Sequence, residues 1–354
     1  MRSPLRPLRL CVEVLLPCCF DSRMRPLLLL LPLLLPLAVQ AAQTRDVKND
    51  DTDHWVERAR QHVYSTVSSE DEKGFERLAP PKPGDWLHTY RERPQTLERY
   101  QLAAKIRPEP ERRTLVLQPL GILDDEKSKV LQLMREYAEV FFQLPVRIEK
   151  PLDLASIGKA FVRNVPLGNR HGTYDKQYNA EQIMLQVLVP RLPEDAVIYL
   201  GITMEDLYCA DQTFVFGLGT LGKRVGVYSL CRYFPEFWGR RRHAGDEIEG
   251  LRRSCKVLNH EAGHMFGITH CIFYRCSMNG SNSLAETDAA PMHYCPVCHR
   301  KLHWNLEFDP LKRYASLEAF YRKNQLVAEA DWMSARLDRW KTLPQKPRPD
   351  IPDE

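Results

Sequence analysis

The sequence HEAGHMFGITH, which runs from His260 to His270, is the most informative part of this 354-residue chain and matches the pattern HExxHxxGxxH at every defined position. On a helix, His260 and His264 lie four residues apart on one face, so both imidazoles can bind one metal ion. Glu261 projects from a different face, where it can act as a general base on a metal-bound water. Gly267 tolerates left-handed backbone, which can end the helix and bring His270 to the metal as a third ligand.

Three protein ligands leave one coordination position open, which is typical of catalytic zinc. A zinc ion in such a site lowers the pKa of a bound water towards about 7 and polarises a carbonyl group. The alternative is that these histidines are ordinary surface or core residues. The additional glycine and third histidine make a chance match far rarer than for HExxH alone, so the sequence predicts a zinc-dependent hydrolase.

Four cysteines follow as a second candidate metal site, with Cys271 and Cys276 in Cx4C spacing and Cys295 and Cys298 in CxxC spacing. Four thiolates can enclose a zinc ion tetrahedrally and leave no open position, as in structural zinc sites. In an oxidising compartment the same residues could instead form two disulfides. The CxxC spacing, and the protection that a bound metal gives to thiols, favour zinc. The other cysteines beyond residue 41 are odd in number and are predicted to be buried free thiols: Cys209, Cys231 and Cys255.

The order of these motifs is specific. His270 is followed directly by Cys271, then by the CxM sequence Cys276-Ser277-Met278, and then by the CxxC pair. In this order the stretch from His260 to Cys298 resembles the archaemetzincins, a family of zinc metallopeptidases of the metzincin clan, and the resemblance extends over roughly residues 80 to 330. It implies a catalytic zinc on His260, His264 and His270, a general base at Glu261, a structural zinc on Cys271, Cys276, Cys295 and Cys298, and Met278 as the Met-turn residue beneath the catalytic zinc.

Met292 is a second candidate for the Met-turn, because Met292-His293-Tyr294 resembles the turn of another metzincin branch. Met278 is favoured, since it lies only eight residues beyond His270, whereas Met292 is constrained by the neighbouring CxxC pair. Met292 is then expected to pack in the core. Three further histidines near the cysteines are expected to support the sites or lie on the surface: His293, His299 and His303.

Outside the motifs, the hydrophobic pattern alternates between strands and helices. Apolar runs predict strands at Leu115–Leu117, Val146–Ile148, Ala196–Ile202, Phe214–Phe216 and Val225–Tyr228, the last two separated by a glycine-rich turn at Gly217–Gly222. Helical patterns span Asp124–Phe141, Ile183–Val189, Leu251–Phe266 and Ser316–Trp340. The alternation predicts an α/β (α+β) fold. With the resemblance, we expect a metzincin-like mixed twisted sheet, an active-site helix carrying HExxH, and a C-terminal helical subdomain with a structural zinc site.

The N-terminus has the layout of a secretory signal peptide. If translation starts at Met24, Arg25 is a short positive segment, and the apolar run at residues 27–39 is too short to span a membrane comfortably. We therefore expect no stable membrane span, and a secreted or periplasmic protein if this leader is real or a cytoplasmic one otherwise. The predicted divisions are residues 1–41 as leader, 42–111 as N-terminal extension, 112–342 as metzincin-like catalytic domain including the four-cysteine zinc site, and 343–354 as disordered tail.

Composition narrows the function further. The chain has 50 Lys and Arg against 46 Asp and Glu, and its first 41 residues hold five Arg but only two acidic residues. The remaining chain is nearly neutral, so no nucleic-acid partner is expected. The leading hypothesis is a metallopeptidase with two zinc ions, in which zinc-bound water, deprotonated by Glu261, hydrolyses a peptide or protein substrate. The alternative is a non-catalytic zinc-stabilised module that binds peptides or other partners.

Overall fold

The computed structural model describes residues 50–157, 159–168, 171, 174–209, 213–219 and 223–342. The predicted leader at 1–41 and tail at 343–354 lie outside the described residues. None of the helices in the described part of the chain is long and apolar enough to cross a membrane.

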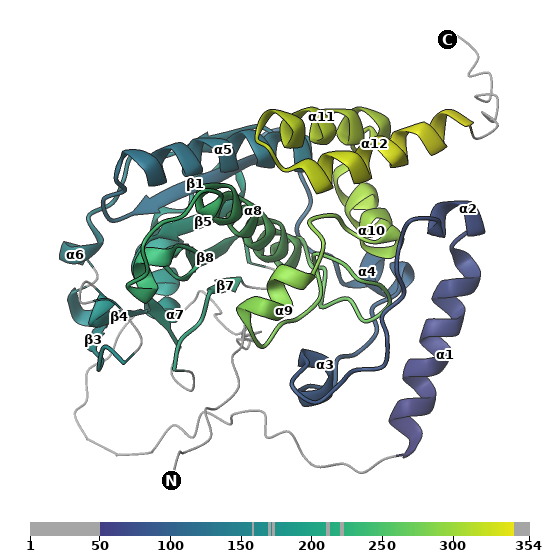
Figure 1. Cartoon of the computed structure of the whole chain (residues 1–354), viewed down its shortest axis with the longest axis horizontal. Coiled ribbons are helices and arrows are strands. Elements are labelled where there is room, and N and C mark those ends of the chain that lie inside the picture. Colours follow the sequence, from purple (N-terminus) through teal and green to yellow (C-terminus); the bar gives the residue numbers. More distant parts are fainter. Residues whose placement is uncertain are drawn as a thin grey trace, which may run out of the picture.

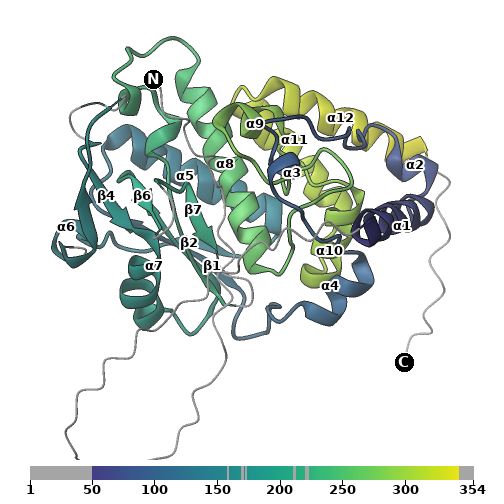
Figure 2. The ribbon, with the colours of Figure 1, turned by 90° about the horizontal axis from the view of Figure 1, so that it is seen from below.

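A five-stranded sheet forms the centre of one half of the molecule (Figures 1 and 2). Its strands follow the order β2 (Val146–Ile148), β1 (Thr114–Leu120), β5 (Ala196–Thr203), β8 (Val225–Ser229) and β7 (Gly217–Gly219). The first four strands pair in parallel, and β7 pairs antiparallel with β8 at the edge of the sheet. The sheet is therefore mixed, as the sequence predicted.

Both faces of the sheet are buried, which explains the almost continuous apolar runs of its central strands. Along β1, Leu115 and Leu117 join one core, which includes α5 (Asp125–Phe142) and α8 (Asp246–Met265). Val116 points to the opposite core, which includes α7 (Ala180–Gln182) and the π-helical segment Ile183–Leu188. The helix α5 begins where the sequence predicted, because the Asp124 side chain accepts a hydrogen bond from the Lys127 amide.

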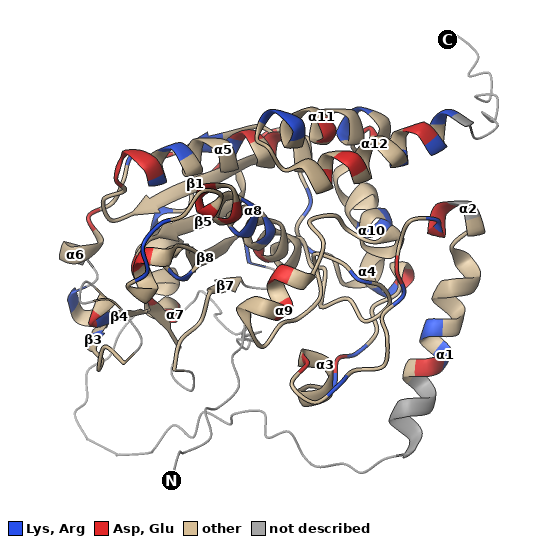
Figure 3. Ribbon diagram, in the orientation of Figure 1, with Lys and Arg blue, Asp and Glu red and all other residues tan. Residues whose placement is uncertain are grey.

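Helices make up the other half of the molecule, and α8 runs between the two halves (Figure 2). The N-terminal extension contributes α1 (Asp50–Thr66), α2 (Ser69–Glu72), α3 (Trp86–Thr89) and α4 (Leu97–Ala103). The C-terminal part contributes α9 (Leu284–Ala289), α10 (Pro296–Leu306), α11 (Pro310–Lys323) and α12 (Val327–Thr342). Basic and acidic residues alternate over α5, α11 and α12 rather than gathering by sign (Figure 3).

The remaining elements are short. A second sheet has the order β3 (Val162–Asn164), β4 (Lys176–Asn179) and β6 (Leu207–Tyr208). One further α-helix, α6 (Leu154–Ile157), lies before it. Short 3₁₀ turns occupy Lys159–Phe161, Val189–Arg191, Cys231–Tyr233 and Pro235–Trp238.

Two predicted elements were wrong. Residues Phe214–Phe216 do not form a strand, and Phe216 instead stacks on Tyr233 with ring centroids 5.4 Å apart. The strand of this region is β7, which lies within the stretch that was predicted to be a glycine-rich turn. The predicted tail helix Ser316–Trp340 is two helices, α11 and α12, separated at Gln325, which has a positive φ of 60°. The other predicted strands and helices lie on observed ones within a few residues, and the predicted fold class is confirmed.

Candidate functional site

The helix α8 carries the first two histidines of the motif and ends just beyond them. Its first turn holds Asp246, Glu247 and Glu249, and their negative charges interact favourably with the positive end of the helix dipole. At the other end Gly267 has φ of +91°, and its amide donates to the His264 carbonyl over 2.8 Å. This left-handed residue ends the helix as predicted and turns the chain towards His270.

The three motif histidines converge in a buried cluster. His260, His264 and His270 are 5%, 2% and 3% exposed, and one ring nitrogen of each lies within 4.8 Å of the others. The Nε2 atoms of His260 and His264 are 3.0 Å apart. Zinc–nitrogen bonds of about 2.1 Å in a tetrahedral site would separate ligand nitrogens by about 3.4 Å, so the cluster is close to a zinc-binding geometry.

Each of these histidines is held through its Nδ1 atom. His260 Nδ1 lies 2.9 Å from the Ser277 carbonyl, and His264 Nδ1 lies 2.7 Å from the Ile268 carbonyl. His270 Nδ1 lies 2.7 Å from Glu92 Oε1, a partner in the N-terminal extension. The other ring nitrogen of His270 is buried and has no hydrogen-bond partner among the described residues. Such anchoring fixes the tautomer and leaves Nε2 for a metal.

The electrostatic environment favours neutral imidazoles, which are the form that binds metal. Burial, aided by His270, lowers the pKa of His260 to about 3. Burial, aided by His260 and His270, holds the pKa of His264 well below its usual value. Burial alone would raise the pKa of Glu92. The hydrogen bond from His270 and other contacts lower this pKa by more than burial raises it, so it lies below its usual value.

Glu261 is fully buried against the edge strand β7. A Cβ atom at Gly217 would lie 3.0 Å from Glu261 Oε1, and one at Gly219 would lie 2.9 Å from Oε2. A side chain at either position would crowd the carboxylate, and at Gly217 its Cβ atom would also lie 2.7 Å from Tyr228 Cβ, so these two glycines make room for Glu261. Sequence reasoning missed this role, although the spacing GxG, with both glycines on one face of a strand, is a usable signal.

Met278 packs against the helix α8 at Gly263. A Cβ atom at Gly263 would lie 2.4 Å from Met278 Sδ and 2.4 Å from Tyr294 Oη. Gly263 immediately precedes His264 in the motif, so its missing side chain lets the thioether approach the helix between the two histidines. Met292 is also buried, and its carbonyl accepts a hydrogen bond from Asn259 Nδ2 over 3.1 Å.

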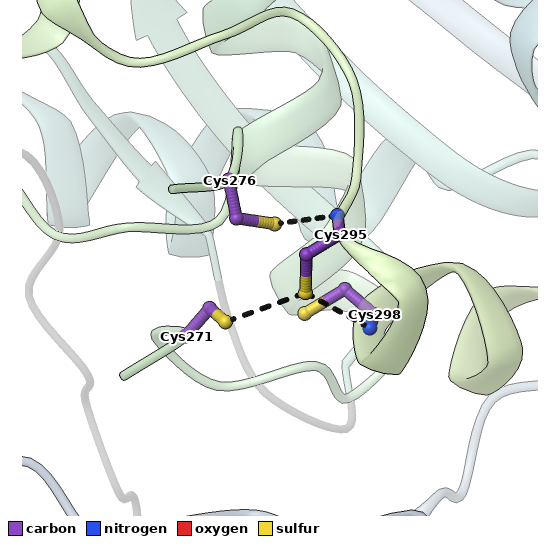
Figure 4. Close-up of side chains that lie close together, drawn as sticks. All are labelled: Cys271, Cys276, Cys295 and Cys298. Atoms are coloured by element: carbon purple, nitrogen blue, oxygen red, sulfur yellow. Dashed lines mark hydrogen bonds between the residues drawn. The ribbon is translucent and has the colours of Figure 1, made fainter. Parts of the chain in front are cut away.

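The four cysteines form a second buried cluster (Figure 4). Their Sγ atoms all lie within 4.8 Å of one another, and those of Cys271 and Cys295 are 3.6 Å apart. Zinc–sulfur bonds of about 2.3 Å would separate tetrahedral ligands by about 3.8 Å. The backbone amide of Cys295 donates to Cys276 Sγ over 3.2 Å, and that of Cys298 donates to Cys295 Sγ over 3.5 Å. None of the cysteines that the structure describes forms a disulfide, and the three outside this cluster, Cys209, Cys231 and Cys255, are also buried.

The three nearby histidines lie outside both clusters and pack on aromatic rings. His293 stacks on Trp332 with centroids 3.7 Å apart, and His299 stacks on Tyr314 at 5.5 Å. His303 contacts Phe308 edge to face at 5.3 Å. These contacts indicate a packing role for each ring.

A cavity of about 420 Å³ opens beside His260. Its walls come from α8, the loop around Ser277, α9 and residues 76–85 of the extension. Lys256 lies in the wall, where its Nζ donates to the Thr287 and Asp288 carbonyls over 3.1 and 2.9 Å. Burial lowers the pKa of this lysine to about 8. Ser277 also lines the cavity, and its buried hydroxyl has no hydrogen-bond partner among the described residues. The space can receive a side chain next to the histidine cluster.

Comparisons with known proteins show which proteins this chain resembles. The profile of Peptidase family M54 matches residues 169–304. Archaemetzincin-2 of Pongo abelii is 32% identical over 263 residues, which are 66% of this chain and 71% of the relative. The archaemetzincin of Thermococcus kodakarensis is 45% identical over 112 residues, 32% of this chain and 59% of the relative. The crystal structure of an archaemetzincin from Archaeoglobus fulgidus, complexed with malonate, is 26% identical and covers 53% of this chain and 99% of its own, with a TM-score of 0.40.

Proposed function

This chain belongs to the archaemetzincin family of zinc metallopeptidases, and on that premise we propose that His260, His264 and His270 hold the catalytic zinc and that Glu261 is the general base. The observation that carries the proposal is the convergence of three buried imidazoles, each anchored through Nδ1 by a different partner. An arrangement of this kind presents three Nε2 atoms to one point and leaves a further coordination position for water or substrate.

The chemistry divides between the metal and the protein. A zinc ion held by the three histidines would lower the pKa of a water ligand and polarise a carbonyl oxygen. Glu261 takes the proton of the attacking water and then delivers it to the nitrogen of the departing amine. Its carboxylate is fully buried beside β7, where Gly217 and Gly219 leave room for it.

The edge strand β7 supports a binding mode for the substrate. Because β7 is the last strand of the described sheet, its outer backbone edge can pair with an extended peptide. The carboxylate of Glu261 lies directly against this strand. A peptide paired with β7 would therefore pass close to the base.

We also propose a second, structural zinc on Cys271, Cys276, Cys295 and Cys298, which gives two zinc ions per chain. The Sγ separation of 3.6 Å between Cys271 and Cys295 is close to that expected for tetrahedral thiolate ligands. Amide donors to two of the sulfur atoms favour thiolates, as they stabilise negative charge. Met278 is the proposed Met-turn residue, on the strength of its contact with Gly263.

Replacing Glu261 tests the proposed function. Glu261→Gln keeps the size of the side chain but removes the base, so kcat/KM for peptide cleavage should fall by at least about 10²-fold to 10⁴-fold while the zinc content stays unchanged. The substrates would come from a peptide library digested by the wild-type protein and analysed by mass spectrometry.

The matched control is Glu247→Gln, the same substitution at an exposed position in the first turn of the same helix. It should cleave at the wild-type rate. If Glu261→Gln also cleaves at that rate, Glu261 is not the base. If the wild-type protein holds zinc but cleaves no peptide in the library, the role of a non-catalytic zinc-stabilised module is favoured instead.

A further inference from the structure

The three motif histidines differ in where their anchors come from. The partners of His260 and His264 are backbone carbonyls 17 and 4 residues away in the sequence, in the loop that follows the helix. The partner of His270 is a carboxylate, Glu92, which lies 178 residues earlier in the chain. Glu92 is outside residues 169–304, the part that the family profile matches.

Glu92 is itself held firmly. Its side chain is 17% exposed, and the same Oε1 atom that contacts His270 accepts a hydrogen bond from Trp86 Nε1 over 2.7 Å. The Trp86 ring meets the His270 ring edge to face with centroids 5.0 Å apart. This indole also occupies the space next to Gly280, where a Cβ atom would lie 2.5 Å from it. These contacts hold the Glu92 carboxylate against His270.

The N-terminal extension also forms hydrogen bonds with the backbone around the C-terminal end of α8. Gln95 donates from Nε2 to the Gly267 carbonyl over 2.8 Å and accepts from the Thr269 amide over 3.2 Å. The Tyr100 hydroxyl donates to the Phe266 carbonyl over 2.9 Å. The turn that leads from α8 to His270 is therefore bound by the N-terminal extension at several points.

We propose that Glu92 is a positioning residue for the catalytic zinc: its carboxylate fixes the rotation and tautomer of His270, so that part of the N-terminal extension belongs to the catalytic centre. The inference rests on the proposed function, because it takes His270 to be a zinc ligand. A carboxylate on the far nitrogen of a ligating imidazole holds the ring in place and increases its basicity, and the loss of such a partner weakens metal binding by about 10-fold to 100-fold.

Zinc affinity measured without substrate tests the proposal. The full chain is treated with a mild chelator to remove labile zinc, and the zinc dissociation constant of the emptied site is then measured by competition with a chromophoric chelator. Glu92→Ala should weaken binding by about 10-fold to 100-fold. Glu92→Gln should recover most of the affinity, because an amide oxygen can still accept from His270 Nδ1 and Trp86 Nε1.

A control separates positioning from general loosening of the extension. Thr96→Ala removes the N-cap of α4, where Thr96 Oγ1 accepts from the Arg99 amide, and so destabilises the same segment by about 1 kcal/mol without touching His270. It should leave the dissociation constant unchanged. Thermal melting of all variants, and the zinc that remains after mild chelation, report whether the fold and the cysteine cluster are intact.

The possible results are distinct. Glu92→Ala binding as tightly as wild type overturns the proposal, as does an equal loss in Thr96→Ala. A loss in Glu92→Gln as large as in Glu92→Ala assigns the effect to charge and overturns a positional role. A wild-type chain that binds no labile zinc overturns the proposed function and this inference together, whereas the earlier results overturn this inference alone.

Discussion

The histidine cluster and the cysteine cluster share a peptide bond, between His270 and Cys271, yet they are built in different ways. The histidine cluster draws its three rings from 11 consecutive residues and orients each ring through a separate partner, one of them in the N-terminal extension. The cysteine cluster draws four sulfur atoms from 28 residues and supports two of them with amides of its own CxxC turn. Three ligands leave a position for chemistry, whereas four ligands close the site.

This difference predicts the largest effect, the selective loss of one metal. Purified protein should contain close to two zinc ions per chain, because the possible ligand atoms of each cluster lie within 4.8 Å of one another. Neutral imidazoles in an open site release zinc more readily than four thiolates, so mild chelation should leave one zinc and abolish peptide cleavage. Elemental analysis together with the cleavage assay measures both changes, and added zinc should restore activity.

A different metal and thiol content would show that the cysteine cluster does not bind zinc. One zinc in the starting protein, together with two disulfides and no reactive thiol among the four cysteines, would contradict the second metal site. The histidine cluster would be unaffected by that result. Thiol titration of the denatured protein under non-reducing conditions distinguishes the two cases.

The shared peptide bond predicts a second, smaller effect. Cys298→Ser should release the proposed structural zinc and thereby loosen the path of the chain at Cys271, next to the proposed ligand His270. Since the Met278 carbonyl also accepts from the Cys271 amide over 2.8 Å, the disturbance reaches the loop under the helix. The affinity of the histidine cluster for zinc should fall by about 10-fold to 100-fold, measured by chelator competition.

A cysteine outside the cluster provides the control for that variant. Cys209→Ser makes the same substitution at a buried position and should keep both zinc ions. Circular dichroism and thermal melting identify a variant that has simply unfolded. A folded Cys298→Ser protein that lacks the second zinc but cleaves peptide at the wild-type rate would show that the two clusters are independent.

Local patterns predicted much of this architecture. The i, i+4 spacing of His260 and His264 requires a helix, and that helix is observed. The apolar runs of β1, β5 and β8 mark buried parallel strands, and these were predicted within a few residues. Such features depend on residues that are close in the sequence, so their periodicity carries the information.

The features that sequence reasoning missed depend on distant partners. From the sequence, Gly217 and Gly219 were predicted to form a turn, but in the structure they lie against Glu261. Phe214 was predicted to lie in a strand, but the Arg232 guanidinium lies 3.3 Å from the centre of its ring. Nothing near Glu92 in the sequence indicates a histidine 178 residues later. The signal peptide at Met24 and the division at residue 111 stay predictions.

The smallest predicted effect concerns the two methionines that compete for the Met-turn. Leu replaces Met with little change in volume, so Met278→Leu and Met292→Leu should each lower the free energy of unfolding by less than about 1.5 kcal/mol, measured by urea denaturation. The pair is matched, since both side chains are buried. Their positions differ, because Met278 Sδ, and not the side chain of Met292, is among the atoms nearest to Gly263, which lies between the two helical histidines. A branched Leu side chain cannot follow the straight thioether into that gap, so Met278→Leu should weaken zinc binding at the histidine cluster by less than about 10-fold, below the loss expected for an anchor of a ligand. Met292→Leu should leave the zinc dissociation constant unchanged. If Met292→Leu weakens zinc binding and Met278→Leu does not, the Met-turn lies next to the CxxC pair, and the two clusters are coupled through Met292 rather than through the loop that ends at Met278.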